Sequence, residues 1–156
     1  MRAVRAIEHS DVCILMIDAT RGFETQDQRI FHIADKNKKG IVILVNKWDS
    51  IEKNTESTQQ FEEQILKQIS PFKDIPILFV SALEKQRLLK GLETAIEVYK
   101  NRTQKITTSD LNETMLAIIE KNPPPATKGK YIKIKYCTML PTTTPSFAFF
   151  ANLPQY

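Results

Sequence analysis

The amino-acid sequence predicts an α/β protein with a parallel sheet, followed by a small α+β domain. Apolar runs without polar alternation suit strands that are buried on both faces. These runs alternate with segments of helical periodicity, which favours right-handed crossovers between parallel strands. The composition changes after Arg102. We therefore predict two domains, at 1–102 and 103–156.

The first domain is predicted to contain three buried strands, at 12–17, 41–45 and 77–80. Apolar residues at helical spacing lie between and after them. Thr25 and Gln28 fit a capping box at the start of the first intervening helix, and Gly40 fits a left-handed C-cap at its end. Another helix is expected from about Gln86 to Lys100. In such sheets, ligands bind beyond the carboxyl ends of the strands.

The second domain is predicted to be a helix followed by two antiparallel strands. A polar linker, 103–109, precedes the helix, and three consecutive prolines at 123–125 end it. The first strand is expected at 131–136, where lysines and isoleucines alternate. The second is expected at 146–151. Its three phenylalanines could stack on nucleobases but are expected in the core: Phe147, Phe149 and Phe150.

Composition excludes several classes of protein. The chain of 156 residues is 42% hydrophobic and 26% charged, which is ordinary for a globular protein. Its longest apolar run, Val12–Ile17, is far shorter than the roughly twenty residues of a transmembrane helix. The N-terminus lacks an apolar signal core. Cys13 and Cys137 are far apart in sequence, so neither a disulfide framework nor a metal site is expected, and a cytoplasmic location is predicted.

The net charge of +4 is concentrated in the second domain, because residues 103–156 hold six lysines and three acidic residues. No acidic residue follows Glu120. Such one-sided charge favours a polyanion such as nucleic acid. A solvated lysine face is the alternative. The candidate RNA contacts are the lysines after the prolines: Lys128, Lys130, Lys133 and Lys135.

Two motifs follow neighbouring strands of the predicted sheet. Asn46-Lys47-Trp48-Asp49 follows the second strand, and Ser81-Ala82 follows the third. A carboxylate accepts hydrogen bonds and can take them from guanine N1–H and N2–H₂, a donor pair that adenine lacks. The lysine stem can cover the base, the asparagine can tie the loop to neighbouring strands, and the Ala82 N–H can donate to guanine O6. An Asx-rich turn that caps a helix is the alternative.

The chain resembles the EngA/Der family of bacterial GTPases, which carry two GTPase (G) domains in tandem. NKxD occurs in most small GTPases, whereas the arginine-rich opening and the NPPP…KGK segment are more specific. The matching segments run almost end to end: Met1–Glu8, Ile17–Thr20, Asn46–Asp49, Ser81–Leu83, Asn122–Pro125, Lys128–Lys130 and Phe150–Pro154. The resemblance implies a P-loop-NTPase-like three-layer fold, GTP hydrolysis, and association with the large ribosomal subunit during its assembly.

The sequence also departs from the family's pattern. It contains no GxxxxGK[ST], so the phosphate cradle and the Mg²⁺-binding hydroxyl are missing. The resemblance therefore implies an incomplete sheet from the C-terminal half of the second G domain, and a KH-like domain truncated at its C-terminal end. We expect a GTPase parent that uses GTP or GDP with Mg²⁺, and no catalytic residue here. Asp18 is expected to be structural rather than a Mg²⁺ ligand.

The leading prediction is guanine recognition within a ribosome-assembly GTPase. The expected guanine-binding residues are Asn46, Lys47, Asp49, Ser81 and Ala82. A non-catalytic RNA- or protein-docking fragment is the first alternative, and the segment lacks the GxxG loop by which KH domains clamp RNA. An unrelated cytoplasmic α/β protein is the second. The strand at 12–17 is expected to leave an open edge that supports self-association.

Overall fold

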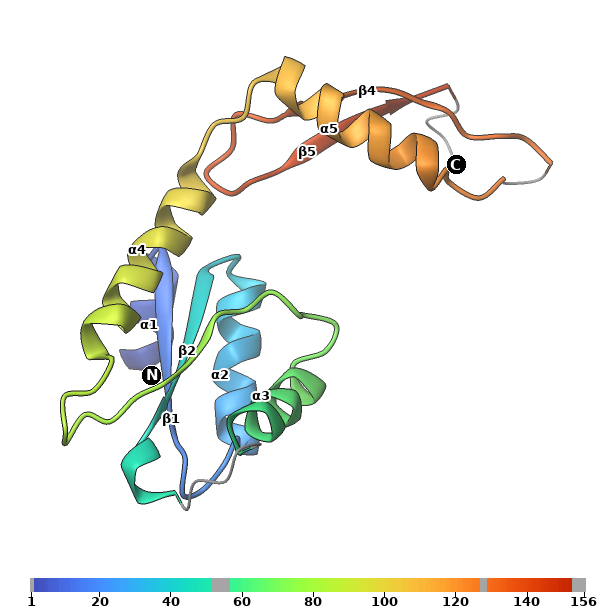
Figure 1. The fold of residues 1–156 in the computed structure, drawn as a ribbon. Coiled ribbons are helices and arrows are strands. Elements are labelled where there is room, and N and C mark those ends of the chain that lie inside the picture. Colours follow the sequence, from blue (N-terminus) through green and yellow to red (C-terminus); the bar gives the residue numbers. More distant parts are fainter. Residues whose placement is uncertain (1, 52–56, 127–128, 153–156) are drawn as a thin grey trace. The chain divides into compact units, whose positions relative to one another are not determined.

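The computed structural model describes residues 2–51, 57–126 and 129–152. The chain divides into two compact units, 1–101 and 102–156. Each unit has its own sheet, parallel in the first and antiparallel in the second. The predicted order, a parallel α/β part followed by a small α+β part, is confirmed (Figure 1).

The first unit alternates helices and strands, as the apolar runs predict. Each run of β-branched and aliphatic residues forms a strand, and the segments with helical spacing form helices. In chain order the elements are α1 (Arg2–His9), β1 (Val12–Asp18), α2 (Thr25–Lys36), β2 (Gly40–Asn46), the 3₁₀ turn η1 (Trp48–Ser50), α3 (Ser57–Gln68), β3 (Ile77–Phe79) and α4 (Leu88–Thr103).

The strands of the first unit lie in the order β1-β2-β3 and run parallel. The β1–β2 register pairs Asp18 with Asn46. The β2–β3 register pairs Val45 with Phe79. The carboxyl ends of neighbouring strands therefore lie next to one another, and the segments that follow them start from the same edge of the sheet.

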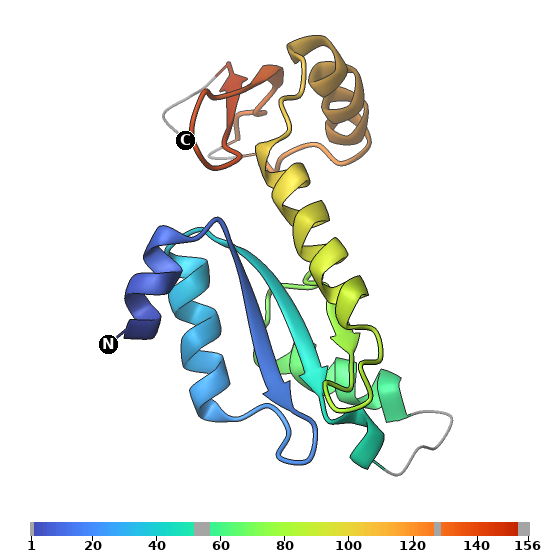
Figure 2. The same cartoon turned by 90° about the vertical axis from the view of Figure 1, so that its left-hand side faces the viewer.

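Helices pack on both faces of this sheet (Figure 2). The prediction of burial on both faces is wrong for β1, where Ile14 and Met16 are 39% and 51% exposed. Phe31 of α2 and Ile65 of α3 belong to one buried cluster with Ile43 of β2. Val42 and Leu44 point to the opposite face and pack with α4 residues. Adjacent β2 residues thus serve two cores, which explains why this strand is an unbroken apolar run.

The ends of α2 differ from the sequence prediction. Asp27 Oδ2 accepts a hydrogen bond from the Glu24 backbone N–H at 2.9 Å, so the capping residues lie one position before Thr25 and Gln28. Gly40 is not a C-cap, because α2 ends at Lys36 and Gly40 begins β2. A Cβ at Gly40 would lie only 2.7 Å from Val98 Cγ1. Close packing therefore explains this glycine better than a left-handed turn.

The second unit packs α5 (Thr108–Lys121) against an antiparallel pair, β4 (Ile134–Met139) and β5 (Phe147–Ala151). The buried Cys137 lies at the centre of this contact. The Asn112 side chain accepts from the Cys137 N–H at 2.8 Å and donates to the Cys137 carbonyl at 2.8 Å. One asparagine thereby joins the helix to the middle of β4.

Two predictions for the second unit are wrong. Strand β4 begins at Ile134 rather than Tyr131, and its register with β5 is irregular between Ile134 and Tyr136, so the simple alternation fails. The phenylalanines expected in the core are exposed. Two strands with one helix among the described residues enclose little volume, which leaves these rings at 41%, 46% and 53% exposure: Phe147, Phe149 and Phe150.

No helix in residues 2–51, 57–126 or 129–152 is long and apolar enough to cross a membrane. Within the same ranges, no group of three or more His, Cys, Asp or Glu side chains is arranged to hold a metal ion.

Candidate guanine-nucleotide site

The two sequence motifs lie side by side at the carboxyl edge of the sheet. The Val80 N–H donates to the Val45 carbonyl at 2.8 Å, which extends the pairing beyond β3. The Trp48 N–H then donates to the Val80 carbonyl at 3.1 Å. These bonds bring the segment after β2 against the segment after β3, so Asn46–Asp49 and Ser81–Ala82 form one edge of the unit.

Asn46 joins the two motifs directly. Its Oδ1 accepts a hydrogen bond from the Ala82 N–H at 2.9 Å, and its carbonyl accepts one from the Ala19 N–H at 2.9 Å. The tie to neighbouring strands that the sequence predicts for this asparagine is present. The Ala82 N–H, however, is already donated to Asn46. A guanine O6 that uses this N–H must share it with Asn46 or displace the asparagine oxygen.

Ser81 holds the turn that presents Ala82. Only 1% of Ser81 is exposed. Its Oγ accepts from the Glu84 N–H at 3.1 Å, and its backbone exchanges hydrogen bonds with Gln86 at 2.9 and 3.3 Å. The serine thus supports the loop from inside, whereas Ala82 lies on the surface.

Lys47 is held by Asp18 at the end of the neighbouring strand. Lys47 Nζ donates to Asp18 Oδ2 at 2.6 Å. The other carboxylate oxygen accepts from the Thr20 N–H at 3.0 Å and from Thr20 Oγ1 at 2.7 Å. The hydrogen bonds from Lys47 and Thr20 lower the pKa of Asp18 from 3.8 to about 2. Lys47 has a left-handed φ of 62°, which turns the chain sharply out of β2.

Trp48 and Asp49 form the 3₁₀ turn that follows. The indole packs on Phe79 with ring centroids 4.4 Å apart and on Phe61 of α3 at 5.7 Å. The expectation that Trp48 packs the loop against a helix is confirmed. The Ser50 hydroxyl donates to Asp49 Oδ2 at 3.1 Å. A packed aromatic residue thus fixes the segment that carries the candidate base-reading carboxylate.

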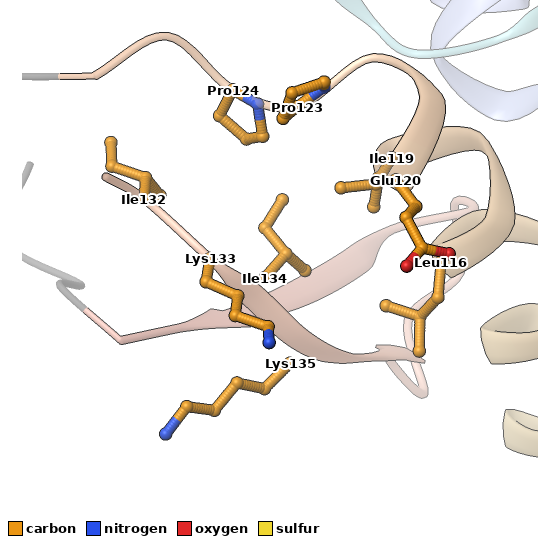
Figure 3. A pocket seen from close by; sticks show the side chains of 9 residues that line it. All are labelled: Leu116, Ile119, Glu120, Pro123, Pro124, Ile132, Lys133, Ile134 and Lys135. Carbon is orange, nitrogen blue, oxygen red and sulfur yellow. The ribbon is translucent and has the colours of Figure 1, made fainter.

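The candidate RNA contacts lie in the second unit. Lys130, Lys133 and Lys135 are exposed, and Lys128 lies outside the described residues. Lys133 and Lys135 also line a groove of about 580 Å³ between the C-terminal half of α5 and the start of β4. Its floor is apolar, and Figure 3 shows Lys135 pointing away from the proline segment. The groove is therefore lined by apolar side chains together with two lysines and the Glu120 carboxylate.

Family comparisons define the class of protein. The family model of the elongation factor Tu GTP-binding domain matches residues 2–122. A second family, the C-terminal KH-domain-like part of EngA bacterial GTPase enzymes, matches residues 105–156. The chain therefore belongs to the family of elongation factor Tu GTP-binding domains.

Individual relatives narrow this class to one group. The chain is 68% identical over 156 residues to GTPase Der of Flavobacterium johnsoniae and 61% identical over 158 residues to GTPase Der of Bacteroides fragilis. Each match covers the whole chain but only 36% of the relative. The resemblance to the EngA/Der family is thereby confirmed.

A solved structure supports the fold. Era of Aquifex aeolicus bound to GDP·AlF4⁻ is 25% identical, with a TM-score of 0.53 over 61% of this chain and 31% of its own. The P-loop-NTPase-like fold class predicted from the sequence is confirmed.

Sequence reasoning missed the contact between Asp18 and Lys47. It assigned Asp18 a structural role and did not place it beside Lys47. Parallel pairing of the apolar runs 12–17 and 41–45 could have indicated the contact, since a polar residue follows each run directly and the register sets Asp18 opposite Asn46, next to Lys47. The support that Ser81 gives to its turn could not be found in the same way, because it depends on an irregular loop.

Proposed function

We propose that this chain supplies guanine recognition to a GTPase that hydrolyses GTP with Mg²⁺. The observation that carries the proposal is the hydrogen bond from the Ala82 N–H to Asn46 Oδ1 at 2.9 Å, which joins the two motifs. A chance NKxD in a surface turn would have no reason to meet a Ser-Ala turn 36 residues later. The GTPase Der relatives support the same assignment.

In this proposal each residue has a separate role. The Asp49 carboxylate accepts from guanine N1–H and N2–H₂ and so discriminates against adenine. The Lys47 stem covers the base, and Asn46 aligns the two loops. The Ala82 N–H donates to O6, and Ser81 holds Ala82 in place. No catalytic residue is assigned to this chain.

The phosphates are expected to depend on a P-loop that these 156 residues do not contain. Base contacts alone should give the chain only about millimolar affinity for GDP, or roughly −4 kcal/mol. Calorimetric titration of the complete gene product with GDP and with ATP tests the proposal. We expect tight GDP binding, no ATP binding, and weak GDP binding to the isolated chain. Equal affinities for GDP and ATP would refute it.

We further propose that the second unit contacts ribosomal RNA, in the large subunit during its assembly, and that the protein therefore acts in the cytoplasm. The exposed Lys130, Lys133 and Lys135 support a polyanion partner, and so does the match to the EngA KH-like family. Sedimentation of the complete gene product with purified large-subunit particles tests this proposal. Failure to co-sediment at low salt would contradict it.

A docking role without catalysis is the second candidate, and the exposed lysines of the second unit favour it: Lys130, Lys133 and Lys135. The two candidates differ in one measurement. Docking alone predicts that ribosomal particles bind equally well with GDP, with a GTP analogue and without nucleotide, whereas a GTPase switch predicts that binding depends on the nucleotide.

We also propose self-association of the isolated chain through β1. Among the described strands only β2 pairs with β1, and Ile14 and Met16 are 39% and 51% exposed. An open apolar edge is a template for another strand, here from a second copy. Light scattering should show a dimer that Met16→Lys weakens. A monomer at high concentration, with rapid exchange of the 12–17 amide protons, would contradict this.

A further inference from the structure

Asp18 occupies a fixed place beside the candidate base-reading loop. It is the last residue of β1, and the parallel register sets it opposite Asn46. Lys47 directly follows β2, and its left-handed backbone carries the chain into the 3₁₀ turn. The sheet therefore positions one carboxylate next to the lysine that the proposed function places over the base.

Both oxygens of Asp18 are engaged. Thr20 donates twice to Oδ1, through its backbone N–H at 3.0 Å and its hydroxyl at 2.7 Å. Lys47 donates to Oδ2 at 2.6 Å. The two Thr20 bonds fix the direction of the carboxylate, so Oδ2 offers an acceptor at a defined point. With Lys47 on Oδ2, this arrangement suits an anchor for an ammonium group better than a ligand for Mg²⁺.

The ion pair between Lys47 and Asp18 is too exposed to solvent to be explained by a contribution to stability alone. The side chains of Lys47 and Asp18 are 57% and 28% exposed, and exposed pairs contribute little to stability. A free lysine would spread its ammonium group over many rotamers, and ordering such a side chain on binding costs free energy. An anchored lysine has already lost much of this freedom before a ligand arrives.

We propose that Asp18 is a positioning residue for nucleotide binding, which holds the Lys47 ammonium so that the lysine stem is preset against the guanine ring. The inference rests on the proposed function. Asp18 itself touches neither base nor phosphate. Its effect on affinity passes through Lys47, and this dependence separates it from a residue that merely supports the strand.

A double-mutant cycle in the complete gene product tests the inference. The GDP dissociation constant is measured for the wild type, Asp18→Asn, Lys47→Gln and the double variant. We expect Asp18→Asn to weaken GDP about tenfold, a coupling of ordinary size for contacting residues. In the Lys47→Gln background the same change should have no further effect. Arg21→Gln, which removes an exposed pair with Glu24 on the same turn, is the matched control and should leave affinity unchanged.

The outcomes distinguish this inference from the proposed function. If Lys47→Gln weakens GDP and Asp18→Asn does not, or if the two losses multiply in the double variant, the positioning role is wrong and the guanine site stands. If neither the wild type nor any variant discriminates GDP from ATP, the proposed function fails first. Thr20→Ala serves if Asp18→Asn does not fold. Thr20→Ala keeps the Asp18 carboxylate and should weaken GDP binding less than Asp18→Asn does. This smaller loss of affinity should also disappear in the Lys47→Gln background.

Discussion

The two units use their side chains in opposite ways. In the first unit, helices pack on both faces of the sheet, and the candidate site consists of hydrogen bonds with defined partners at the strand ends. In the second, a single described helix packs on two strands, and the candidate contacts are exposed lysines. The comparison separates recognition by fixed geometry from recognition by surface charge.

The difference follows from how much core each unit has. A sheet with helices on both faces restrains its strand ends, because the central strand β2 is buried from Ile41 to Val45. Residues that follow such strands can be placed within hydrogen-bonding distance of one another. A two-stranded sheet with one open face offers no such restraint. Charge acts over several ångströms and tolerates this looser placement.

The largest expected effect comes from the core of the first unit. Phe31 is 1% exposed and packs on Phe72 with ring centroids 5.5 Å apart, so Phe31→Ala should cost about 3–5 kcal/mol of stability. Urea unfolding followed by the fluorescence of Trp48, the only tryptophan, measures this. The matched change Phe150→Ala, at a ring 53% exposed, should cost less than about 1 kcal/mol by circular dichroism. Equal losses of stability in the two variants would contradict the difference in core packing between the two units.

A smaller effect is expected from the charges of the second unit. Replacing Lys130, Lys133 and Lys135 with glutamine should weaken RNA binding by the same factor whatever the sequence of the RNA. The slope of log K against log salt should fall by about 2, at roughly 0.7 per single-strand phosphate contact. Filter binding of a single-stranded RNA at several salt concentrations gives this slope. The same number of substitutions at exposed lysines of the first unit, Lys36, Lys67 and Lys73, is the control. An equal fall in slope for the two sets of lysine substitutions would contradict the assignment of the second-unit lysines as RNA contacts.

The smallest effect concerns pH. Asp18 has a folded pKa of about 2, below its ordinary 3.8, so the unfolded chain binds more protons between these values and stability rises with pH there. The contribution of Asp18 is present above about pH 4 and is lost as the pH falls toward 2. Urea midpoints across this range should fall less steeply for Asp18→Asn than for the wild type. Parallel curves would show that the pair with Lys47 does not form in solution.

The sequence predicts much of the first unit because its strands are defined by continuous apolar runs. Val12–Ile17 and Ile41–Val45 lie within the observed strands. The sequence does not predict Glu24 as the cap of α2 or the packing role of Gly40, because both depend on the register of neighbouring elements. In the second unit, the alternation of lysines and isoleucines predicts a strand at 131–136. The observed strand begins at Ile134, and its register with β5 shifts between Ile134 and Tyr136, so its pairing does not follow the alternation.

The same reasoning limits what the sequence says of the candidate site. The residue types of Asn46–Asp49 and Ser81–Ala82 indicate guanine, since a carboxylate and an N–H match its edge. The pair formed by Asp18 and Lys47 depends on strand order. The hydrogen bond that already engages the Ala82 N–H depends on the rotamer of Asn46. Neither can be read from residue types.

The most direct test of base recognition is Asp49→Asn in the complete gene product. The wild-type carboxylate accepts two hydrogen bonds from the base. The asparagine amide instead offers one acceptor group and one donor group. Xanthine carries a C2 oxygen where guanine has its amino group, so it matches the amide. Titration with GDP and xanthosine diphosphate should show GDP binding at least about a hundredfold weaker and a gain for xanthosine diphosphate. Unchanged GDP affinity in this variant would contradict the assignment of Asp49 and of the site built around it.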